Sequence, residues 1–147
     1  MRWQASFAVA LGRRGQAAAG GRVLPTAAAT LALQALHVAE EFATGFHVVG
    51  PRAIGLPSWP PEMFVSVNLA AIAVWCMVLR IFALGRSSLL PTALLWFLAL
   101  MGMGHAVIHA GLSIMNRAYY PGTITGVLLG IAGFLLAACL SGRGRST

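Results

Sequence analysis

Two short clusters of ionisable side chains interrupt an otherwise apolar sequence. His37 is followed three and four residues later by Glu40 and Glu41, and His105 is followed four residues later by His109. In a helix, this spacing places the members of each cluster on one face. Imidazole and carboxylate groups are ligands of zinc and non-haem iron, and they also serve as general acids and bases. The two clusters are therefore the candidate site for chemistry.

The composition determines the surroundings of these residues. The chain has 147 residues, of which 59% are hydrophobic and 9% are charged, and its mean hydropathy is +0.81. A soluble domain carries about 25% charged residues, so an ordinary soluble globule and a disordered chain are both excluded. We predict an integral protein of the cell membrane, with membrane lipid as a partner. The net charge of +7 comes from arginines spread between apolar runs, which favours lipid headgroups over nucleic acid as their partners.

Four segments are long and apolar enough to be membrane spans, for which about 20 residues are needed. The pattern contains no strand signals, so we predict an all-α protein with a four-helix transmembrane bundle. The spans are expected at residues 23–47, 63–84, 88–116 and 121–141.

The bundle is predicted to form one domain over residues 23–141, between a basic, flexible or interfacial N-terminal arm (1–22) and a basic C-terminal tail (142–147). Eight arginines flank the spans on the side of the termini, whereas the other side holds only Arg52 and Arg117. The positive-inside rule then places both termini in the cytoplasm and the 48–62 loop outside.

This topology brings the polar residues to one depth. With a rise of about 1.5 Å per residue, His37 and His105 lie at nearly the same height in the outer half of the membrane. Asn68 in the second span belongs to the same layer, while the inner half is almost purely apolar. Each ionisable residue inside a span costs about 2.5–3.5 kcal/mol on insertion scales, so these side chains should face one another inside the bundle.

The sequence also resembles a known family. The segment His37-Val38-Ala39-Glu40-Glu41 is similar to the signature of the small HXXEE-motif membrane proteins, whose function is unassigned. A second block agrees with it in order and consists of His109, Ser113-Ile114-Met115-Asn116-Arg117, Tyr120-Pro121-Gly122 and Thr125. The resemblance covers most of the chain after about residue 30, and it implies a membrane fold and a site but no reaction. His105 stands where the family pattern implies an asparagine.

Our first hypothesis is a metal-dependent membrane enzyme. A mononuclear zinc or non-haem iron would be held by His37, Glu41, His105 and His109, since a carboxylate-bridged pair of metals normally takes four Glu. Catalytic roles are assigned to His37, Glu40, Glu41 and Asn68. The expected reaction is hydrolysis or oxidation of a hydrophobic, lipid- or terpenoid-like small molecule.

Two alternatives use the same residues. Without metal, the neighbouring Glu40 and Glu41 would form an acid–base pair that isomerises or cyclises an apolar substrate, because burial and like charge keep one carboxyl protonated. Alternatively, the polar groups simply join helices in a non-catalytic bundle that stabilises a membrane partner. A homodimer is compatible with each hypothesis, because the chain is small for a large substrate.

Overall fold

The computed structural model describes the backbone of residues 2–84 and 89–144 and the side chains of residues 21–84 and 89–142. The described residues form five helices and no strand, which confirms the all-α prediction. The helices are α1 (Arg2–Ala43), α2 (Phe46–Ala53), α3 (Pro61–Ala83), α4 (Leu89–Asn116) and α5 (Thr123–Gly144). The predicted N-terminal arm is helical from Arg2 and continuous with α1, whereas the tail beyond Gly144 lies outside the described residues.

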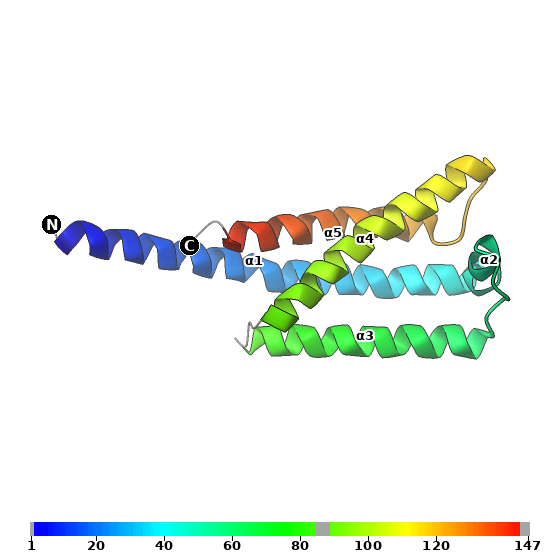
Figure 1. Ribbon diagram of the computed structural model, residues 1–147, viewed down its shortest axis with the longest axis horizontal. Helices are drawn as coiled ribbons and strands as arrows, with labels where there is room; N and C mark the ends of the chain where they lie inside the picture. The colour runs from blue at the N-terminus through cyan, green and yellow to red at the C-terminus, as the bar shows by residue number, and fades with distance from the viewer. Residues whose placement is uncertain (1, 85–88, 145–147) are drawn as a thin grey trace.

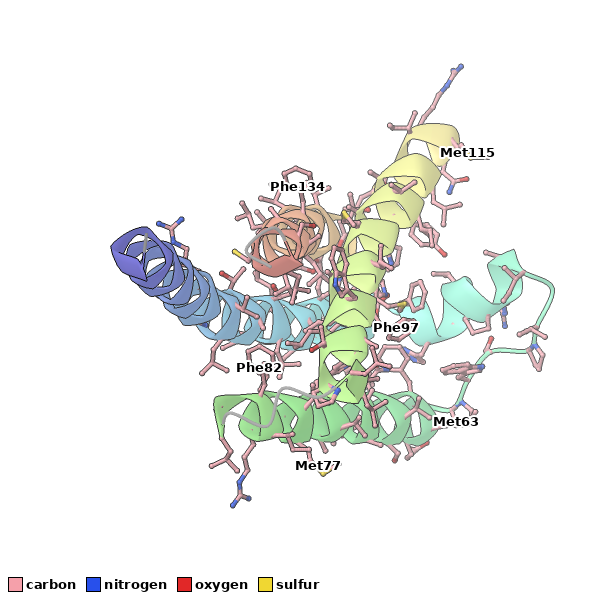
Figure 2. All side chains as sticks on the ribbon, turned by 60° about the vertical axis from the view of Figure 1, so that its left-hand side comes forward. Met63, Met77, Phe82, Phe97, Met115 and Phe134 are labelled. Atoms are coloured by element: carbon pink, nitrogen blue, oxygen red, sulfur yellow. The ribbon has the colours of Figure 1, made fainter. Side chains whose placement is uncertain are left out.

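Three helices, α3, α4 and α5, are long and apolar enough to cross a membrane. Their outward surfaces carry large apolar side chains, among them Met63, Met77 and Phe134, which project away from the other helices (Figure 2). Such a surface suits lipid rather than water. The helix α1 is longer, but it is not among the three, since Gln34, His37 and the two Glu residues lower its hydropathy.

The helices pack around α1 (Figure 1). The helix α5 runs along α1 on one side and α3 runs along it on the other, while α4 crosses obliquely and packs mainly on α5. The start of α4 lies beside the end of α3, and the two helices diverge from there. The short α2 and the turn between α4 and α5 lie together at the end of the molecule opposite to both termini.

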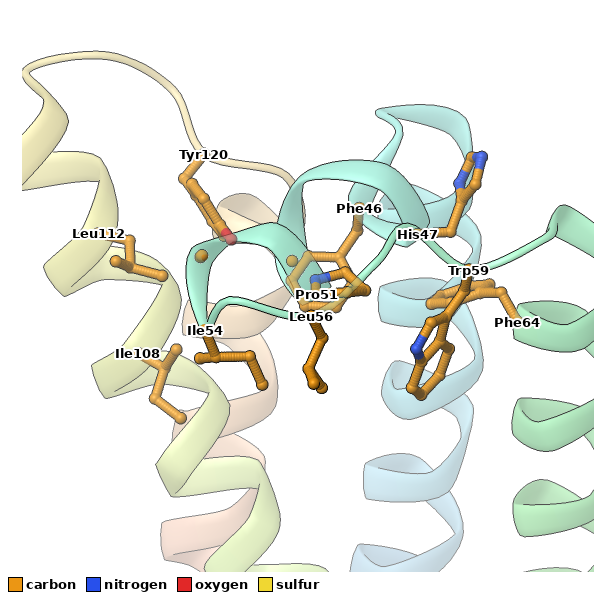
Figure 3. Close-up of a pocket in the computed structure, with 12 residues that line it drawn as sticks. Phe46, His47, Pro51, Ile54, Leu56, Trp59, Phe64, Ile108, Leu112 and Tyr120 are labelled. Atoms are coloured by element: carbon orange, nitrogen blue, oxygen red, sulfur yellow. The ribbon is translucent and has the colours of Figure 1, made fainter.

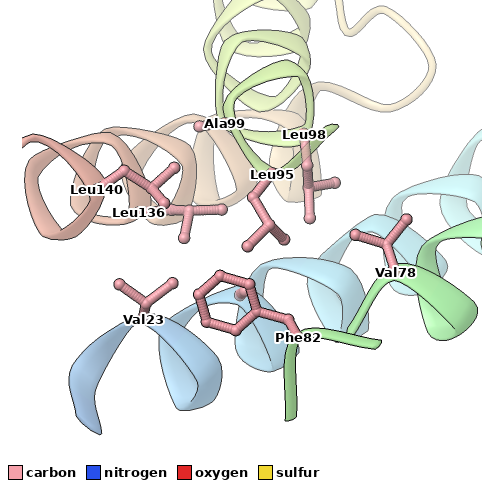
Figure 4. Close-up of a cluster of buried hydrophobic side chains, with 9 residues drawn as sticks. Val23, Val78, Phe82, Leu95, Leu98, Ala99, Leu136 and Leu140 are labelled. Carbon is pink, nitrogen blue, oxygen red and sulfur yellow. The ribbon is translucent and has the colours of Figure 1, made fainter. Parts of the chain in front are cut away.

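An apolar core joins α1, α3, α4 and α5 at the end opposite to α2 (Figure 4). Leu95 of α4 and Leu136 of α5 are fully buried there against Val23, and Phe82 of α3 covers them. In lipid, such contacts stabilise helix association through close packing rather than through exclusion of water. This core anchors the ends of the helices far from the polar clusters.

The first predicted span is wrong at its end. The helix α1 stops at Ala43, and Gly45 has φ = 81° and ψ = 23°, a left-handed conformation that favours glycine and terminates a helix. The chain then turns into α2, so His47 does not lie on the first span, and the first part of the expected 48–62 loop is helical. The loop that follows is joined to α2 by a hydrogen bond from Trp59 N to the His47 carbonyl oxygen (2.8 Å).

Glycines permit the close approach of α4 and α5. A Cβ at Gly133 would lie 2.5 Å from the Ala99 carbonyl oxygen and 3.2 Å from the Met103 nitrogen, both backbone atoms that cannot rotate away. One turn earlier in α5, a Cβ at Gly130 would lie 2.3 Å from Ala106 Cβ. Small residues at this spacing are typical of tightly packed membrane helices.

We therefore expect Gly133→Ala to destabilise the protein by about 1–3 kcal/mol, the usual cost of an overpacked contact. The matched control is Gly104→Ala in α4, where a Cβ meets nothing within 4 Å. It should leave stability unchanged or raise it slightly, because alanine is the better helix former. Thermal unfolding in detergent measures both variants, and equal midpoints for the two would contradict the close contact.

Candidate metal centre

The two ionisable clusters of the sequence meet in the interior of the structure. Of the described residues, four polar ones are buried, namely Thr30, His37, Glu41 and His109. The last three belong to the clusters, and they come from α1 and α4, which are far apart in the sequence. The spacing predicted that His37 and Glu41 share one face of their helix, and this is the face that meets His109 of α4.

The three histidines form a compact group. The candidate ligand atoms of His37, His105 and His109, one ring nitrogen from each, all lie within 4.8 Å of one another. The ring centroid of His37 lies 4.8 Å from that of His105 and 4.8 Å from that of His109. His37 and His109 are fully buried, while His105 is half-buried. Three imidazoles at this separation are a donor set suited to a zinc or iron ion.

Hydrogen bonds fix the proton on one nitrogen of each ring. Nδ1 of His105 lies 2.7 Å from the Met101 carbonyl oxygen, and Nδ1 of His109 lies 2.5 Å from the Pro121 carbonyl oxygen. A carbonyl oxygen only accepts, so both rings donate from Nδ1. Nδ1 of His37 lies 3.0 Å from the Thr125 hydroxyl, which gives its own proton to Glu40 and so accepts from His37. In the neutral rings, every Nε2 then carries a lone pair.

Two of these Nε2 atoms face one carboxylate oxygen. Oε1 of Glu41 lies 3.4 Å from Nε2 of His37 and 3.3 Å from Nε2 of His109. Among the described residues, Nε2 of His37 has no hydrogen-bond partner. Lone pairs directed at a buried anion repel it, and a buried charge without a counter-charge is costly. The repulsion at this point is removed by a proton on Glu41 or on one of the rings, or by a metal ion bound between them.

Glu40 has a different set of partners. Its carboxylate accepts hydrogen bonds from the backbone nitrogens of Ile124 (3.1 Å) and Thr125 (2.7 Å) and from the hydroxyls of Thr125 and Tyr119. These donors are at the N-terminus of α5, where a negative charge also interacts favourably with the helix dipole. Among the described residues, the carboxylates of Glu40 and Glu41 have no hydrogen-bond or ion-pair partner in common.

The turn between α4 and α5 closes the site. Gly122 in this turn has φ = 83°, and a Cβ on it would lie 2.8 Å from His37 Cε1, 2.9 Å from Glu41 Cγ and 2.9 Å from His109 Cε1. Only glycine satisfies both the left-handed backbone and this contact. The turn is held by the Ser113 hydroxyl, which accepts from the Tyr120 nitrogen (2.9 Å) and bonds to the Thr123 hydroxyl (2.6 Å).

Burial and the nearby acids raise the pKa of both tyrosines in this turn. Burial, followed by the hydrogen bond to Glu40 and the charge of that residue, raises the pKa of Tyr119 above its ordinary value. Burial, followed by the negative charge of Glu41, raises the pKa of Tyr120. Each phenol thus stays neutral through the physiological pH range and remains a hydrogen-bond donor. The sequence pattern contained these residues in its second block, but their contacts with Glu40 and Glu41 were not predictable from spacing.

Asn68 lies apart from the buried group. Its side-chain nitrogen donates to the Phe64 carbonyl oxygen on its own helix (2.9 Å), and no contact with Glu41 or with His109 is found among the described side chains. It does line a cavity of about 180 Å³ that His105 also lines. Of the polar layer predicted from the sequence, the three histidines and Glu41 thus form a compact centre. Asn68 lies outside this centre, at a cavity that His105 also lines.

An apolar pocket of about 280 Å³ adjoins the other side of the centre (Figure 3). It lies between α2, the loop after it and α4, and its lining includes Pro51, Leu56 and Leu112. Phe46 and Tyr120 also line it, and their rings lie 5.4 Å and 5.8 Å from the His109 ring. One layer of aromatic side chains thus separates this pocket from the buried histidines.

Comparison with known proteins identifies the family. Residues 28–137 match the family described as "Protein of unknown function with HXXEE motif". The matched region includes His37, Glu41, His105 and His109, and the chain belongs to this family, which confirms the resemblance seen in the sequence. No curated protein and no solved structure matches the chain.

The cap formed by Glu40 can be tested separately from the centre. We expect Glu40→Gln to lower the free energy of unfolding by about 1–2 kcal/mol, the range for loss of a helix cap, because an amide has one acceptor oxygen and no charge. Glu62→Gln is the matched control, since Glu62 is exposed in the first turn of α3. Denaturation in mixed detergent measures both variants. A Glu40→Gln protein as stable as the control would show that the cap contributes nothing.

Proposed function

We propose that this protein is a small membrane-embedded metalloenzyme that acts on a hydrophobic substrate. His37, His105 and His109 are the ligands of a single zinc or iron ion, and Glu41 is the carboxylate beside them. The observation that carries the proposal is the approach of two unprotonated ring nitrogens to one buried carboxylate oxygen, at 3.3 and 3.4 Å. A divalent cation balances the charge of Glu41 and uses the lone pairs at the same time.

The surroundings of the rings support metal binding. Metal-ligating histidines almost always donate their second ring N–H to a carbonyl, a carboxylate or another acceptor, which fixes the ring orientation. His105 and His109 donate to carbonyl oxygens, and His37 donates to the Thr125 hydroxyl. Zinc with three histidines keeps a fourth position for water, whose pKa it lowers to about 7. Glu41, whose Oε1 lies 3.4 Å from Nε2 of His37 and 3.3 Å from Nε2 of His109, would be the group beside the ion that could accept a proton.

The character of the neighbouring space supports a hydrophobic substrate. The pocket beside His109 is lined almost entirely by apolar side chains, and α3, α4 and α5 are apolar enough to lie in lipid. Binding sites of this kind are mostly apolar with a few polar groups that orient the ligand. A lipid- or terpenoid-like molecule is the substrate class that such a site selects, with hydrolysis or oxidation as the reaction.

The same proposal includes the topology. We take α1 as the fourth spanning helix, because α3 and α5 pack along it, and we place both termini in the cytoplasm in accordance with the arginine distribution. Of the polar groups on α1 that lower its hydropathy, His37 and Glu41 are buried in the centre, and Glu40 is bonded to the start of α5. The centre then lies near the outer leaflet.

Metal content is the first test. We expect protein purified in detergent without chelators to contain close to one equivalent of zinc or iron by elemental mass spectrometry. His109→Ala should lose most of this metal, because a ligand and its contact with Glu41 disappear together. Metal at a hundredfold excess over its Kd should also raise the free energy of unfolding by about 2.7 kcal/mol.

The control for metal content is His47→Ala. His47 is the remaining histidine of the chain, and it stacks on Phe42 at 5.5 Å, outside the ligand group. This variant should keep its metal. Folded wild-type protein that holds no zinc or iron, even after reconstitution, would overturn the metalloenzyme proposal.

The orientation is tested by cysteine labelling. In a chain with Cys76 and Cys139 replaced by alanine, we expect Gly55→Cys to react with a membrane-impermeant maleimide added outside intact cells. Gly55 is exposed in the loop after α2, and it lies on the side predicted to be external. Gly142→Cys at the end of α5 should react only after the cells are opened. The reverse pattern would place the centre in the cytoplasmic leaflet.

A further inference from the structure

A second cavity adjoins the centre on the side of His105. It has a volume of about 180 Å³ and lies between α1, α3 and α4, where its lining includes Gln34, Asn68, Ile72, Trp75, Phe97 and His105. His105 is the half-buried member of the three histidines. This cavity therefore reaches the proposed ligand group directly, without an intervening side chain.

Two other cavities lie along α4 and share lining residues with this one or with each other. Phe97, Met101 and His105 also line a neighbouring cavity of about 260 Å³, and Ile108 lines both that cavity and the apolar pocket below α2. We call these three adjoining cavities the α3–α4 cleft. It lies where α4 turns away from α3 (Figure 2), and the side chains of Phe97 and Ile108 at its edge are more than half exposed. The cleft thus opens sideways, toward the lipid that surrounds the helices.

Two amides give this apolar cleft a polar end. Asn68 uses one side-chain N–H on the Phe64 carbonyl oxygen, so its amide oxygen, an acceptor, and its second N–H stay available to a ligand. Gln34, half-buried in α1, provides both a donor and an acceptor. No hydrogen bond to the Asn68 oxygen or to the Gln34 amide is found within the described residues. Amides with unused hydrogen-bonding capacity beside an apolar cavity can orient the polar group of a ligand.

We infer that the α3–α4 cleft binds a long-chain alcohol, with the hydroxyl at Gln34 and Asn68 and the hydrocarbon chain directed along α4 into the bilayer. A hydroxyl group both donates and accepts, so it can donate to the Asn68 oxygen and accept from the Gln34 nitrogen at once. An ether or a ketone only accepts and would leave the Asn68 oxygen unpaired. This inference rests on the proposed function, for which it names the substrate class and the route of entry.

The apolar lining of the cleft fits the rest of such a ligand. The pocket below α2 accommodates a chain, and the sideways opening lets a molecule dissolved in the bilayer enter without crossing water. The hydroxyl end would then lie next to His105, on the wall that the cavity shares with the proposed metal centre.

Competitive photolabelling tests this inference on the wild-type protein. Full-length protein in phosphatidylcholine nanodiscs is irradiated with a hexadecanol that carries an alkyl diazirine in its chain, and labelled peptides are located by mass spectrometry. We expect labelling of the α3 and α4 segments that line the cleft. Unlabelled hexadecanol should compete about fivefold better than hexadecyl methyl ether, because the ether lacks one hydrogen bond, and hexadecane should compete more weakly still. Equal competition by all three compounds would overturn the inference.

Variants sharpen the test. Asn68→Leu should remove the advantage of the alcohol over the ether, whereas Asn116→Leu, at the exposed end of α4, should leave it unchanged. Retention of the full preference in folded Asn68→Leu protein would also refute the assignment. Metal content is measured on the same samples, which separates the two proposals. Alcohol preference without metal would refute the metalloenzyme alone, and metal without alcohol preference would refute the cleft alone.

Discussion

The buried carboxylate of Glu41 is the constraint on which the rest of the structure depends. A charge in the interior of a bundle is stable only when an opposite charge and hydrogen bonds compensate it. The two atoms nearest to Glu41 Oε1 that could do so are Nε2 of His37, on the same helix, and Nε2 of His109, on α4. These contacts join α1 to α4 at the centre of the site.

Glu40, the acid next to Glu41, bonds to the start of α5. Successive helical residues point in directions about 100° apart, so Glu40 projects toward α5 while Glu41 projects toward α4. By accepting from the backbone of Ile124 and Thr125, Glu40 holds the N-terminus of α5 against α1. Thr125 then links the two halves, because its hydroxyl donates to Glu40 and accepts from His37. In the HXXEE motif, one glutamate thus belongs to the centre and the other positions a helix beside it.

The two ends of the molecule differ in the side chains that lie between their helices. At the end near the termini, α1, α3, α4 and α5 pack through leucine, valine and phenylalanine, with no charge to satisfy. At the other end, α4 diverges from α3, and the space between them holds cavities, amides and the wall of the centre. One end of the molecule is thus tightly packed and apolar, whereas the other end holds the buried polar groups with cavities beside them.

The sequence by itself determined the helical class and the family, and it singled out the two clusters from which His37, Glu41 and His109 come. Hydrophobic runs and the spacing of His37, Glu41 and His109 are local properties, and helical periodicity converts them directly into faces. It did not determine the end of the first span, because the left-handed Gly45 turn depends on how α2 returns to the bundle. Nor could it distinguish Glu40 from Glu41, or place Asn68 across a cavity from the histidines. Those assignments depend on which helix each side chain meets, and only the packing of α1, α4 and α5 decided that.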